Sequence, residues 1–260
     1  MASVHATAIV GDGAELAGDV SVGAYAVVEG EVVIGSGSVI HPHAIVRGPT
    51  TLGPGNVVHP FAVLGGEPQD RRNAAGGRLD VGEGNIFREH VTVHRGTAAR
   101  PTQIGAFNLF MVGAHIAHDA SIGSHCVLAN AVQVAGHCVI EDWVTFGGLS
   151  GIAQHVRVGE SAFVAAAAAC ERSVPPFVVV QGDRARVRGL NVVGLRRRAV
   201  PEASIAALRR AVRMVWMSTM TRAQALTALD SAGDPFVGRL AAALRESALP
   251  ERRRAPPSRA

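Results

Sequence analysis

The sequence predicts a mainly β protein, a parallel β-helix followed by a small C-terminal α-helical domain. The first observation is an apolar residue at every sixth position from Val4 to Leu64. The same phase restarts at Val81 and again at Ile104, and it continues to Cys170. A fixed short repeat is typical of stacked, similar coils, and hexapeptide repeats are the signature of a parallel β-helix. The second observation is that the apolar spacing becomes helical near the C-terminus.

Each coil of the predicted β-helix should contain three hexads. Residues three hexads apart should then stack at the spacing of neighbouring strands, about 4.8 Å. We expect the aliphatic positions to point inward, and Gly, Asn or Asp to occupy the corners that need a positive φ. Two interruptions of the repeat, at about 65–80 and 96–103, predict loops that leave the helix. Loops on a rigid scaffold are frequent functional positions.

The repeat ends near Val174, where a Pro-Pro pair stops the pattern. Thr221, with Gln224 three residues later, predicts a capping box at the start of a second helix. We therefore expect a β-helix over 1–190 and a helical domain over 191–260, with about the last ten residues disordered. The residues at helical spacing in the first long helix are Ile205, Leu208, Val212, Val215 and Trp216.

The composition favours a soluble cytoplasmic protein. Of the 260 residues, 48% are hydrophobic, which is ample for a core. The longest strongly apolar stretch, 162–170, is much shorter than the roughly 20 residues of a membrane span, and the first ten residues lack the basic region of a signal peptide. Cys126, Cys138 and Cys170 form no CxxC pattern, so we expect free, structural thiols.

Charge is divided unevenly along the chain. All 25 basic residues are Arg. Residues 1–183 carry 9 Arg against 16 acidic residues, whereas 184–260 carry 16 Arg against 5. A solvated, arginine-rich helical surface would explain most of these residues. If the C-terminal part binds a partner, an acidic protein or a phosphorylated substrate fits better than nucleic acid, because no aromatic platform or DNA-reading motif accompanies the arginines.

Histidines and other polar residues concentrate between residues 88 and 155. Asp119 follows His118 directly, and His137 lies one coil and one residue later, so both imidazoles should project from the same side of adjacent coils. A His beside a carboxylate is suited to general base catalysis. No GxSxG motif and no catalytic Cys setting is present, so direct attack by a substrate hydroxyl is the simpler scheme. For any single His, an ordinary corner position is the alternative, and three His at a subunit edge can also bind zinc.

Several segments of the chain are similar to those of one enzyme family. They are VTVHRGT, NLFMVGAHIAHDASIG, LAN, AGH, and QG with NVVGLRRR, all between residues 91 and 198. They resemble the UDP-N-acetylglucosamine O-acyltransferases of lipid A biosynthesis, and AHIAHD is the most specific element. The resemblance implies a left-handed β-helix, despite the usual right-handed crossover rule. It also implies a homotrimer with active sites between subunits, acyl carrier protein as the acyl donor, and neither a cofactor nor a metal.

The resemblance also implies roles for individual residues. His118 would be the general base that deprotonates the 3-hydroxyl of the glucosamine, Asp119 would orient it, and the N–H of Gly136 would stabilise the oxyanion. Ala166 would lie where acyl-chain length is gauged. The substrate-binding residues would be Asp70, Arg72, His115, His137, Gln154, Asn191, Arg197 and Arg198, the last three for the nucleotide and, nearby, the carrier protein.

Three departures from the family pattern concern the substrate. Ala153 stands where a His usually precedes the Gln, so one polar contact is lost or is replaced by His155. The loop after Asp70 reads RRNAAGG where Lys-Tyr is more usual, and Arg72 can keep the cation. A methyl group at Ala166, where Gly is frequent, would shorten the preferred acyl chain.

Three alternative functions stay open at the level of sequence. The first is N-acylation of the 3-amino analogue of UDP-N-acetylglucosamine, which some members of the resembled family perform. The second is a zinc enzyme similar to the γ-carbonic anhydrases, which share this type of coil. The third is a non-catalytic binder of sugar nucleotides whose chemistry decayed at Ala153.

Overall fold

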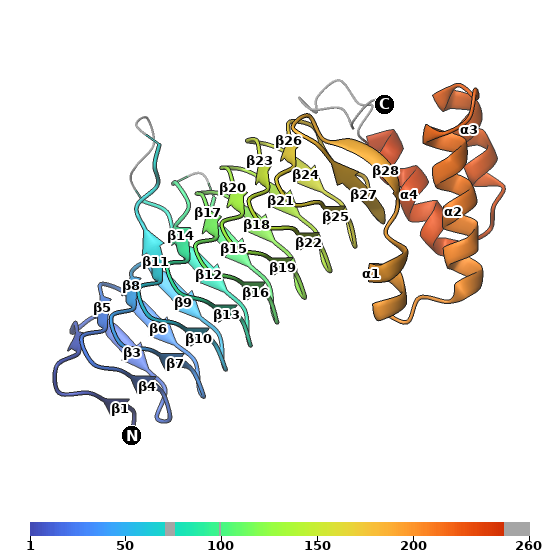
Figure 1. Ribbon diagram of the computed structural model, residues 1–260. Coiled ribbons are helices and arrows are strands. Elements are labelled where there is room, and N and C mark those ends of the chain that lie inside the picture. Colours follow the sequence, from blue (N-terminus) through green and yellow to red (C-terminus); the bar gives the residue numbers. More distant parts are fainter. Residues whose placement is uncertain (71–75, 99, 247–260) are drawn as a thin grey trace.

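The computed structural model is a long parallel β-helix with four helices at its C-terminal end (Figure 1). It describes residues 1–70, 76–98 and 100–246. Each coil crosses three sheets in turn, which we call A, B and C, and the repeated strands within each sheet are parallel. The fold class predicted from the six-residue period is thereby confirmed.

The strands are short, mostly two or three residues. Sheet A contains β1 (Ser3–Val4), β4 (Ser21–Val22), β7 (Val39–Ile40), β10 (Val57–Val58), β13 (Ile86–Phe87), β16 (Leu109–Phe110), β19 (Val127–Leu128), β22 (Thr145–Phe146), β25 (Phe163–Val164), β27 (Val178–Gln181) and β28 (Arg186–Leu190). Sheet B contains β2 (Ile9–Val10), β5 (Val27–Glu29), β8 (Ile45–Arg47), β11 (Val63–Gly66), β14 (Thr92–His94), β17 (His115–Ile116), β20 (Gln133–Val134), β23 (Gly151–Ile152) and β26 (Ala169–Cys170). Sheet C contains β3 (Ala14–Leu16), β6 (Val32–Ile34), β9 (Thr50–Leu52), β12 (Leu79–Val81), β15 (Thr102–Ile104), β18 (Ser121–Ile122), β21 (Val139–Ile140) and β24 (Arg157–Val158).

Equivalent residues of successive coils lie opposite one another. In sheet A, Val22 pairs with Ile40, and Ile40 pairs with Val58. All three side chains are buried, as the period predicted. The interior of the β-helix is therefore a stack of aliphatic layers, and each coil covers the apolar surface of the next.

Both interruptions of the repeat leave the helix at the same corner. Strand β11 ends at Gly66 and β12 begins at Leu79, so the first insertion spans 67–78. Strand β14 ends at His94 and β15 begins at Thr102, so the second insertion spans 95–101. Each insertion connects a strand of sheet B to a strand of sheet C. We call this edge of the β-helix the B–C corner, and name the A–B and C–A corners likewise.

The corner residues differ from the prediction. Positive φ angles occur at several Gly residues, but also at many aromatic residues and histidines. Among the described residues Asp119 is the only Asp or Asn with a positive φ. The outward-pointing rings stack on their equivalents one coil away, as in the pair Tyr25–His43 at 5.2 Å and the pair His125–Trp143 at 4.1 Å. Stacking offsets part of the cost of the left-handed conformation, about 1–2 kcal/mol per residue.

Asn56, Asn85 and Asn108 do lie at a corner, but none of them has a positive φ, and their buried side chains point into the helix. The Oδ1 of Asn56 accepts a hydrogen bond from Asn85 Nδ2 at 3.1 Å, and Asn85 Oδ1 accepts one from Asn108 Nδ2 at 2.9 Å. The same two oxygens accept the backbone N–H groups of Asn85 and Asn108, each at 3.0 Å. This ladder satisfies buried polar groups at the C–A corner from coil to coil, which the pattern of apolar residues alone did not reveal.

The three cysteines are free and buried, as predicted. Burial raises the pKa of Cys126 to about 12, and burial likewise raises the pKa of Cys170 to about 12. Cys126 continues the asparagine ladder, because its N–H donates to Asn108 Oδ1 at 2.7 Å. These thiols therefore fill the interior as small apolar side chains.

The helical domain follows an antiparallel hairpin of β27 and β28 at the end of sheet A. Its helices are α1 (Val192–Arg197), α2 (Glu202–Trp216), α3 (Arg222–Asp230) and α4 (Pro235–Glu246). Helix α2 buries Ile205 and Leu208 as predicted, and the capping box of Thr221 and Gln224 at the start of α3 is confirmed. No helix among the described residues has the length and apolarity needed to cross a bilayer. The disorder expected at the C-terminus falls on 247–260, outside the described residues.

Replacing Asn85 by Ala should destabilise the β-helix. The substitution removes acceptors and donors for both neighbouring coils and leaves buried amides unpaired, so we expect a loss of about 2–3 kcal/mol in the free energy of unfolding. Urea denaturation followed by circular dichroism measures it. Glu83→Ala, an exposed residue of the same turn, is the control and should change stability by less than about 0.5 kcal/mol. Equal stability of the two variants would show that the ladder contributes little.

Candidate active site

A pocket of about 480 Å³ lies on the outer face of sheet B beside the B–C corner. Four residues proposed from the sequence line it: His115, His118, Gly136 and Gln154. Most of the remaining wall is apolar, and much of it is small, so the pocket combines a hydrocarbon-like surface with a few polar groups. The small wall residues are Ala117, Ala135, Gly151, Ala153 and Ala169.

His118 and Asp119 form a buried pair at the turn after β17. The distance from His118 Nδ1 to Asp119 Oδ2 is 2.6 Å, and the two residues are only 5% and 0% exposed. Because an ionised carboxylate only accepts hydrogen bonds, Nδ1 carries the hydrogen and Nε2 is left as the basic nitrogen. The side of the ring with Nε2 packs against Gly136, where a Cβ would lie 3.0 Å from that nitrogen.

The carboxylate of Asp119 is held by the second insertion. Its Oδ1 accepts hydrogen bonds from the backbone N–H and the hydroxyl of Thr97, both at 3.0 Å, and its own N–H donates to Thr102 Oγ1 at 2.9 Å. Burial alone would raise the pKa of Asp119, but the hydrogen bonds from His118 and Thr97 outweigh burial and lower it. Asp119 is therefore ionised at neutral pH.

The first insertion supports the second. Gly76 forms a β-bridge with Thr97, and Gly77 lies so close that an added Cβ would collide with the carbonyl oxygen of Gly96. Sequence reasoning missed the roles of Thr97 and Thr102. The available signal was the position of Thr97 at the end of the VTVHRGT segment, but the path of a loop cannot be read from a strand period.

Two further histidines extend the cluster along the B–C corner. The ring of His137 meets that of His118 edge to face at 5.2 Å, which confirms that the two project from adjacent coils on one side. Its Nε2 lies 3.8 Å from Asp119 Oδ2. His155 stacks on His137 at 4.7 Å, next to Gln154 in the pocket wall.

The imidazoles on sheet B are held in the neutral form. Thr92 Oγ1 lies 2.8 Å from His115 Nδ1, and burial lowers the pKa of His115, with a smaller contribution from His118. His94 packs edge to face on His115 at 4.9 Å, and burial, reinforced by His115 and His118, lowers the pKa of His94 to about 4. A neutral His115 can orient a polar substrate group without adding charge to the pocket.

Asp70 and Ala166, which were also proposed from the sequence, do not line this pocket. Gln69, in the first insertion, lines the pocket, but its neighbour Asp70 does not. Arg72 lies outside the described residues. Ala166 is exposed at the A–B corner, close to Gly147, and does not line the pocket.

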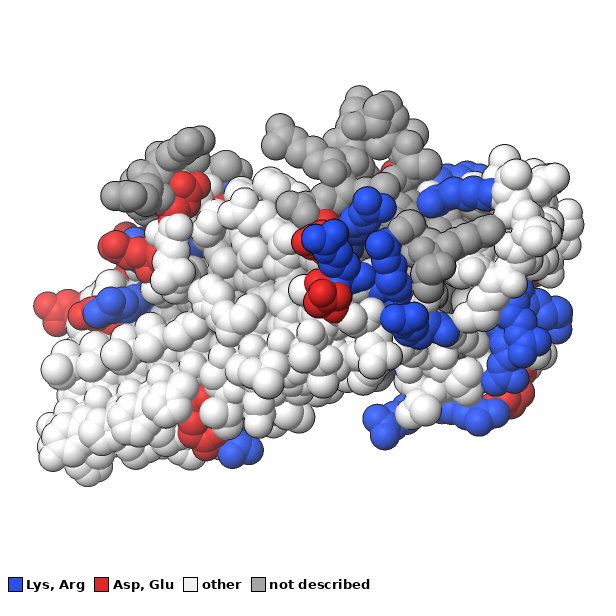
Figure 2. All heavy atoms as spheres, turned by 45° about the horizontal axis from the view of Figure 1, so that its top comes forward, with Lys and Arg blue, Asp and Glu red and all other residues white. Residues whose placement is uncertain are grey.

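The proposed nucleotide-binding residues lie at a different corner of the chain. Asn191 is buried, caps α1 through Gly194 N–H, and donates from Nδ2 to the carbonyl of Ser161 at the C–A corner. Arg198 also contacts Ser161, and Arg197 is exposed beside it. Sheet C separates these residues from His118, so one chain does not bring them together. Arginine side chains gather over the C-terminal, helical end of the molecule (Figure 2).

The side chains of His118, Asp119 and His137 also offer donor atoms within 4.8 Å of one another, as a metal site would. His118 Nδ1 and Asp119 Oδ2 are too close to bind one zinc ion together. Two ligand atoms of a tetrahedral zinc site lie roughly 3.3 Å apart, whereas His118 Nδ1 and Asp119 Oδ2 are 2.6 Å apart, a hydrogen-bonding distance.

Acid should destabilise the fold through His94. Its folded pKa of about 4 lies below the value of 6.5 for a free imidazole, so the unfolded chain binds the proton more tightly. The free energy of unfolding should therefore fall as the pH drops from about 7 to 5. The free energy of unfolding of His94→Asn should fall less steeply with pH, and that of His5→Asn, which changes an exposed histidine, should follow the wild type. Urea titrations at each pH test this, and parallel slopes for His94→Asn and the wild type would contradict it.

Comparison with known proteins supports a single family. The profile of bacterial transferase hexapeptide repeats matches residues 31–66, and that of domain 2 of UDP N-acetylglucosamine O-acyltransferase matches residues 174–253. A protein of Gloeothece citriformis is 41% identical over 196 residues, covering 74% of this chain and 71% of the relative. One of Herminiimonas arsenicoxydans is 40% identical over 88% of both chains. Both are named acyl-[acyl-carrier-protein]–UDP-N-acetylglucosamine O-acyltransferase.

Solved structures agree with the sequence relatives. LpxA of Acinetobacter baumannii superposes with a TM-score of 0.89 at 36% identity, covering 94% of this chain and 96% of that one. The UDP-N-acetylglucosamine acyltransferase of Campylobacter jejuni gives a TM-score of 0.91 at 32% identity over 99% of this chain and 100% of that one. The chain therefore belongs to the family of acyl-[acyl-carrier-protein]–UDP-N-acetylglucosamine O-acyltransferases.

Proposed function

We propose that this protein transfers a 3-hydroxyacyl chain from acyl carrier protein to the 3-hydroxyl of UDP-N-acetylglucosamine, the first step of lipid A biosynthesis. The observation that carries the proposal is the buried His118–Asp119 pair beside Gly136, in a chain of this family. The proposal places the protein in the cytoplasm. It also includes no cofactor, because a base and an oxyanion donor suffice for acyl transfer from a thioester.

His118 is the general base of the proposed reaction. Asp119 accepts the hydrogen bond from Nδ1–H, which leaves Nε2 to remove the proton of the sugar hydroxyl as its oxygen attacks the thioester carbonyl carbon. The C–S bond of the tetrahedral intermediate then breaks, and the proton passes from Nε2 to the leaving thiolate. Asp119 stabilises the imidazolium without itself taking the proton.

Gly136 donates its backbone N–H to the oxyanion. Within the described residues this N–H has no hydrogen-bond acceptor, unlike the N–H groups of Ala135 and His137 on either side of it. Glycine is needed here because a Cβ would collide with the His118 ring. The small apolar wall of the pocket suits the hydrocarbon chain, while His115 and Gln154 are placed to contact polar groups of the sugar.

The complete site forms in a homotrimer. Asn191, Arg197 and Arg198 lie at the C–A corner and His118 at the B–C corner, so a neighbouring subunit must supply the nucleotide-binding side chains. The guanidinium groups suit a diphosphate. Ala166, exposed at the A–B corner, would reach the acyl chain through the same association.

Replacing His118 by Ala should strongly slow catalysis but leave substrate binding intact. Loss of a general base lowers kcat by about 10²–10⁴-fold, whereas the contacts to UDP remain. Steady-state assays and calorimetric titration with UDP-N-acetylglucosamine measure the two effects. His43→Ala, which removes an exposed imidazole of the A–B corner, is the control. An active His118→Ala variant would refute this role, and an inactive wild type that still binds UDP-sugar would favour a decayed, non-catalytic binder.

A mixed-substrate assay decides the acceptor. The enzyme is given UDP-N-acetylglucosamine and its 3-amino analogue together with several acyl carrier proteins, and the products are identified by mass spectrometry. We expect an ester of the 3-hydroxyl as the main product. The shorter acyl chains of the mixture should be preferred, because the methyl group of Ala166 would shorten the space for the chain. An amide formed in place of the ester would show that the amine is the acceptor, while the transferase assignment would stand.

A further inference from the structure

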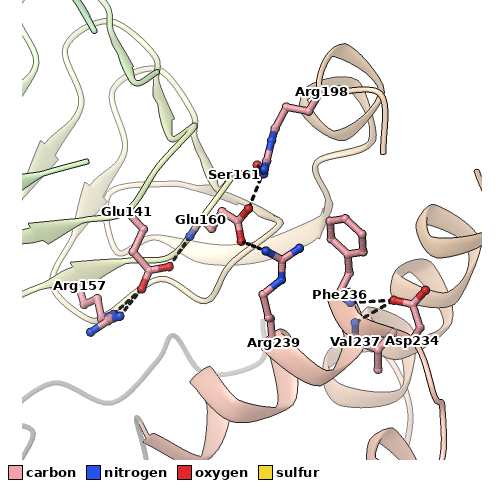
Figure 3. Close-up of polar contacts among 9 residues, drawn as sticks. All are labelled: Glu141, Arg157, Glu160, Ser161, Arg198, Asp234, Phe236, Val237 and Arg239. Atoms are coloured by element: carbon pink, nitrogen blue, oxygen red, sulfur yellow. Dashed lines mark hydrogen bonds and ion pairs between the residues drawn. The ribbon is translucent and has the colours of Figure 1, made fainter. Parts of the chain in front are cut away.

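Arg198, at the end of α1, is held in a cluster of partly buried side chains (Figure 3). Its Nη2 lies 2.7 Å from Glu160 Oε1, and Nη1 donates to Ser161 Oγ. The guanidinium carbon also lies 5.0 Å from the centre of the Trp143 ring. The Arg198 side chain is only 18% exposed, so these contacts fix its direction at the C–A corner.

Glu160 is shared between two arginines from different parts of the chain. Its Oε2 lies 2.9 Å from Nη1 of Arg239, which belongs to α4. The carboxylate is 15% exposed, and the backbone of Glu160 is fixed by hydrogen bonds to Glu141 and Phe177. Two cations therefore surround one carboxylate, and the cluster keeps a net positive charge.

Arg239 also contacts two aromatic rings. Its guanidinium lies 4.4 Å from the centre of the Phe236 ring and 5.5 Å from that of Phe177. Asp234 begins α4 by accepting the N–H groups of Phe236 and Val237, at 2.9 and 3.1 Å, which fixes the first turn of the helix (Figure 3). The start of helix α4 and the two ring contacts therefore fix the orientation of Arg239 toward Glu160.

We propose that Glu160 is a positioning residue for the nucleotide site, and that Arg239 keeps this site cationic. Glu160 fixes the guanidinium of Arg198, whose N–H donors are more numerous than its two polar contacts, so donors remain for a diphosphate. Arg239 shares the Glu160 charge, so Arg198 is not fully neutralised. The inference deepens the proposed function and rests on it.

A purely electrostatic role would give the opposite sign. Without the Glu160 carboxylate the cluster would carry more positive charge, and simple attraction would then tighten the binding of a diphosphate. If positioning dominates, the freed Arg198 side chain must be ordered again when the ligand binds, and binding weakens. The direction of the change therefore separates the two roles.

The test is Glu160→Gln in the full-length enzyme. We expect the Kd for UDP and the KM for UDP-N-acetylglucosamine to rise about tenfold, with kcat and the KM for acyl carrier protein within about twofold of wild type. Arg239→Gln should raise the same two constants by about threefold, because Glu160 then neutralises Arg198 alone. The second variant tests separately whether Arg239 keeps the site cationic, and UDP binding unchanged in Arg239→Gln would overturn that part of the proposal.

Glu202→Gln is the matched control. It removes the exposed ion pair with Arg196, two residues before Arg198, and should leave all four quantities unchanged. Tighter or unchanged UDP binding in Glu160→Gln, an equal effect in Glu202→Gln, or a rise in the KM for acyl carrier protein in place of that for the sugar would each overturn the inference. A wild-type enzyme that does not bind UDP would overturn the proposed function as well.

Discussion

The stacking register of the coils constrains the rest of the molecule. Each strand inside the stack pairs with the coil before it and the coil after it, so extra residues within a sheet would disturb both ladders. Extra residues must leave at a corner, and both insertions leave at the B–C corner. The pocket lies beside this corner, and Gln69 of the first insertion forms part of its wall.

The same register explains how a carboxylate can be buried on the surface of a β-helix. An isolated buried charge is costly unless it is paired and hydrogen-bonded. Asp119 receives hydrogen bonds from its neighbour His118 and from Thr97, whose loop starts on the preceding coil. The two insertions contact each other through Gly76 and Thr97. Their packing therefore holds Thr97 where it can donate hydrogen bonds to the Asp119 carboxylate.

The sequence predicted the features that follow the six-residue repeat, and it missed contacts made by the loops and the C-terminal helices. The six-residue period located the buried aliphatic residues, and the spacing of His118 and His137 by one coil and one residue correctly placed their rings together. The period does not distinguish inward from outward side chains at a corner, so it does not predict the asparagine ladder. The contacts of Thr97 and of Glu160 depend on loop paths and on the docking of helices, which are tertiary properties that local patterns do not contain.

The three buried cysteines have a practical consequence. A thiol reacts as its thiolate, and a pKa of about 12, as in Cys126 and Cys170, leaves almost no thiolate at neutral pH. The natural chain should therefore be nearly silent toward maleimides while it is folded. A single cysteine introduced at an exposed corner, such as Ser36, would accept a spin label or a dye without removal of the native thiols, so distances between subunits become measurable in solution.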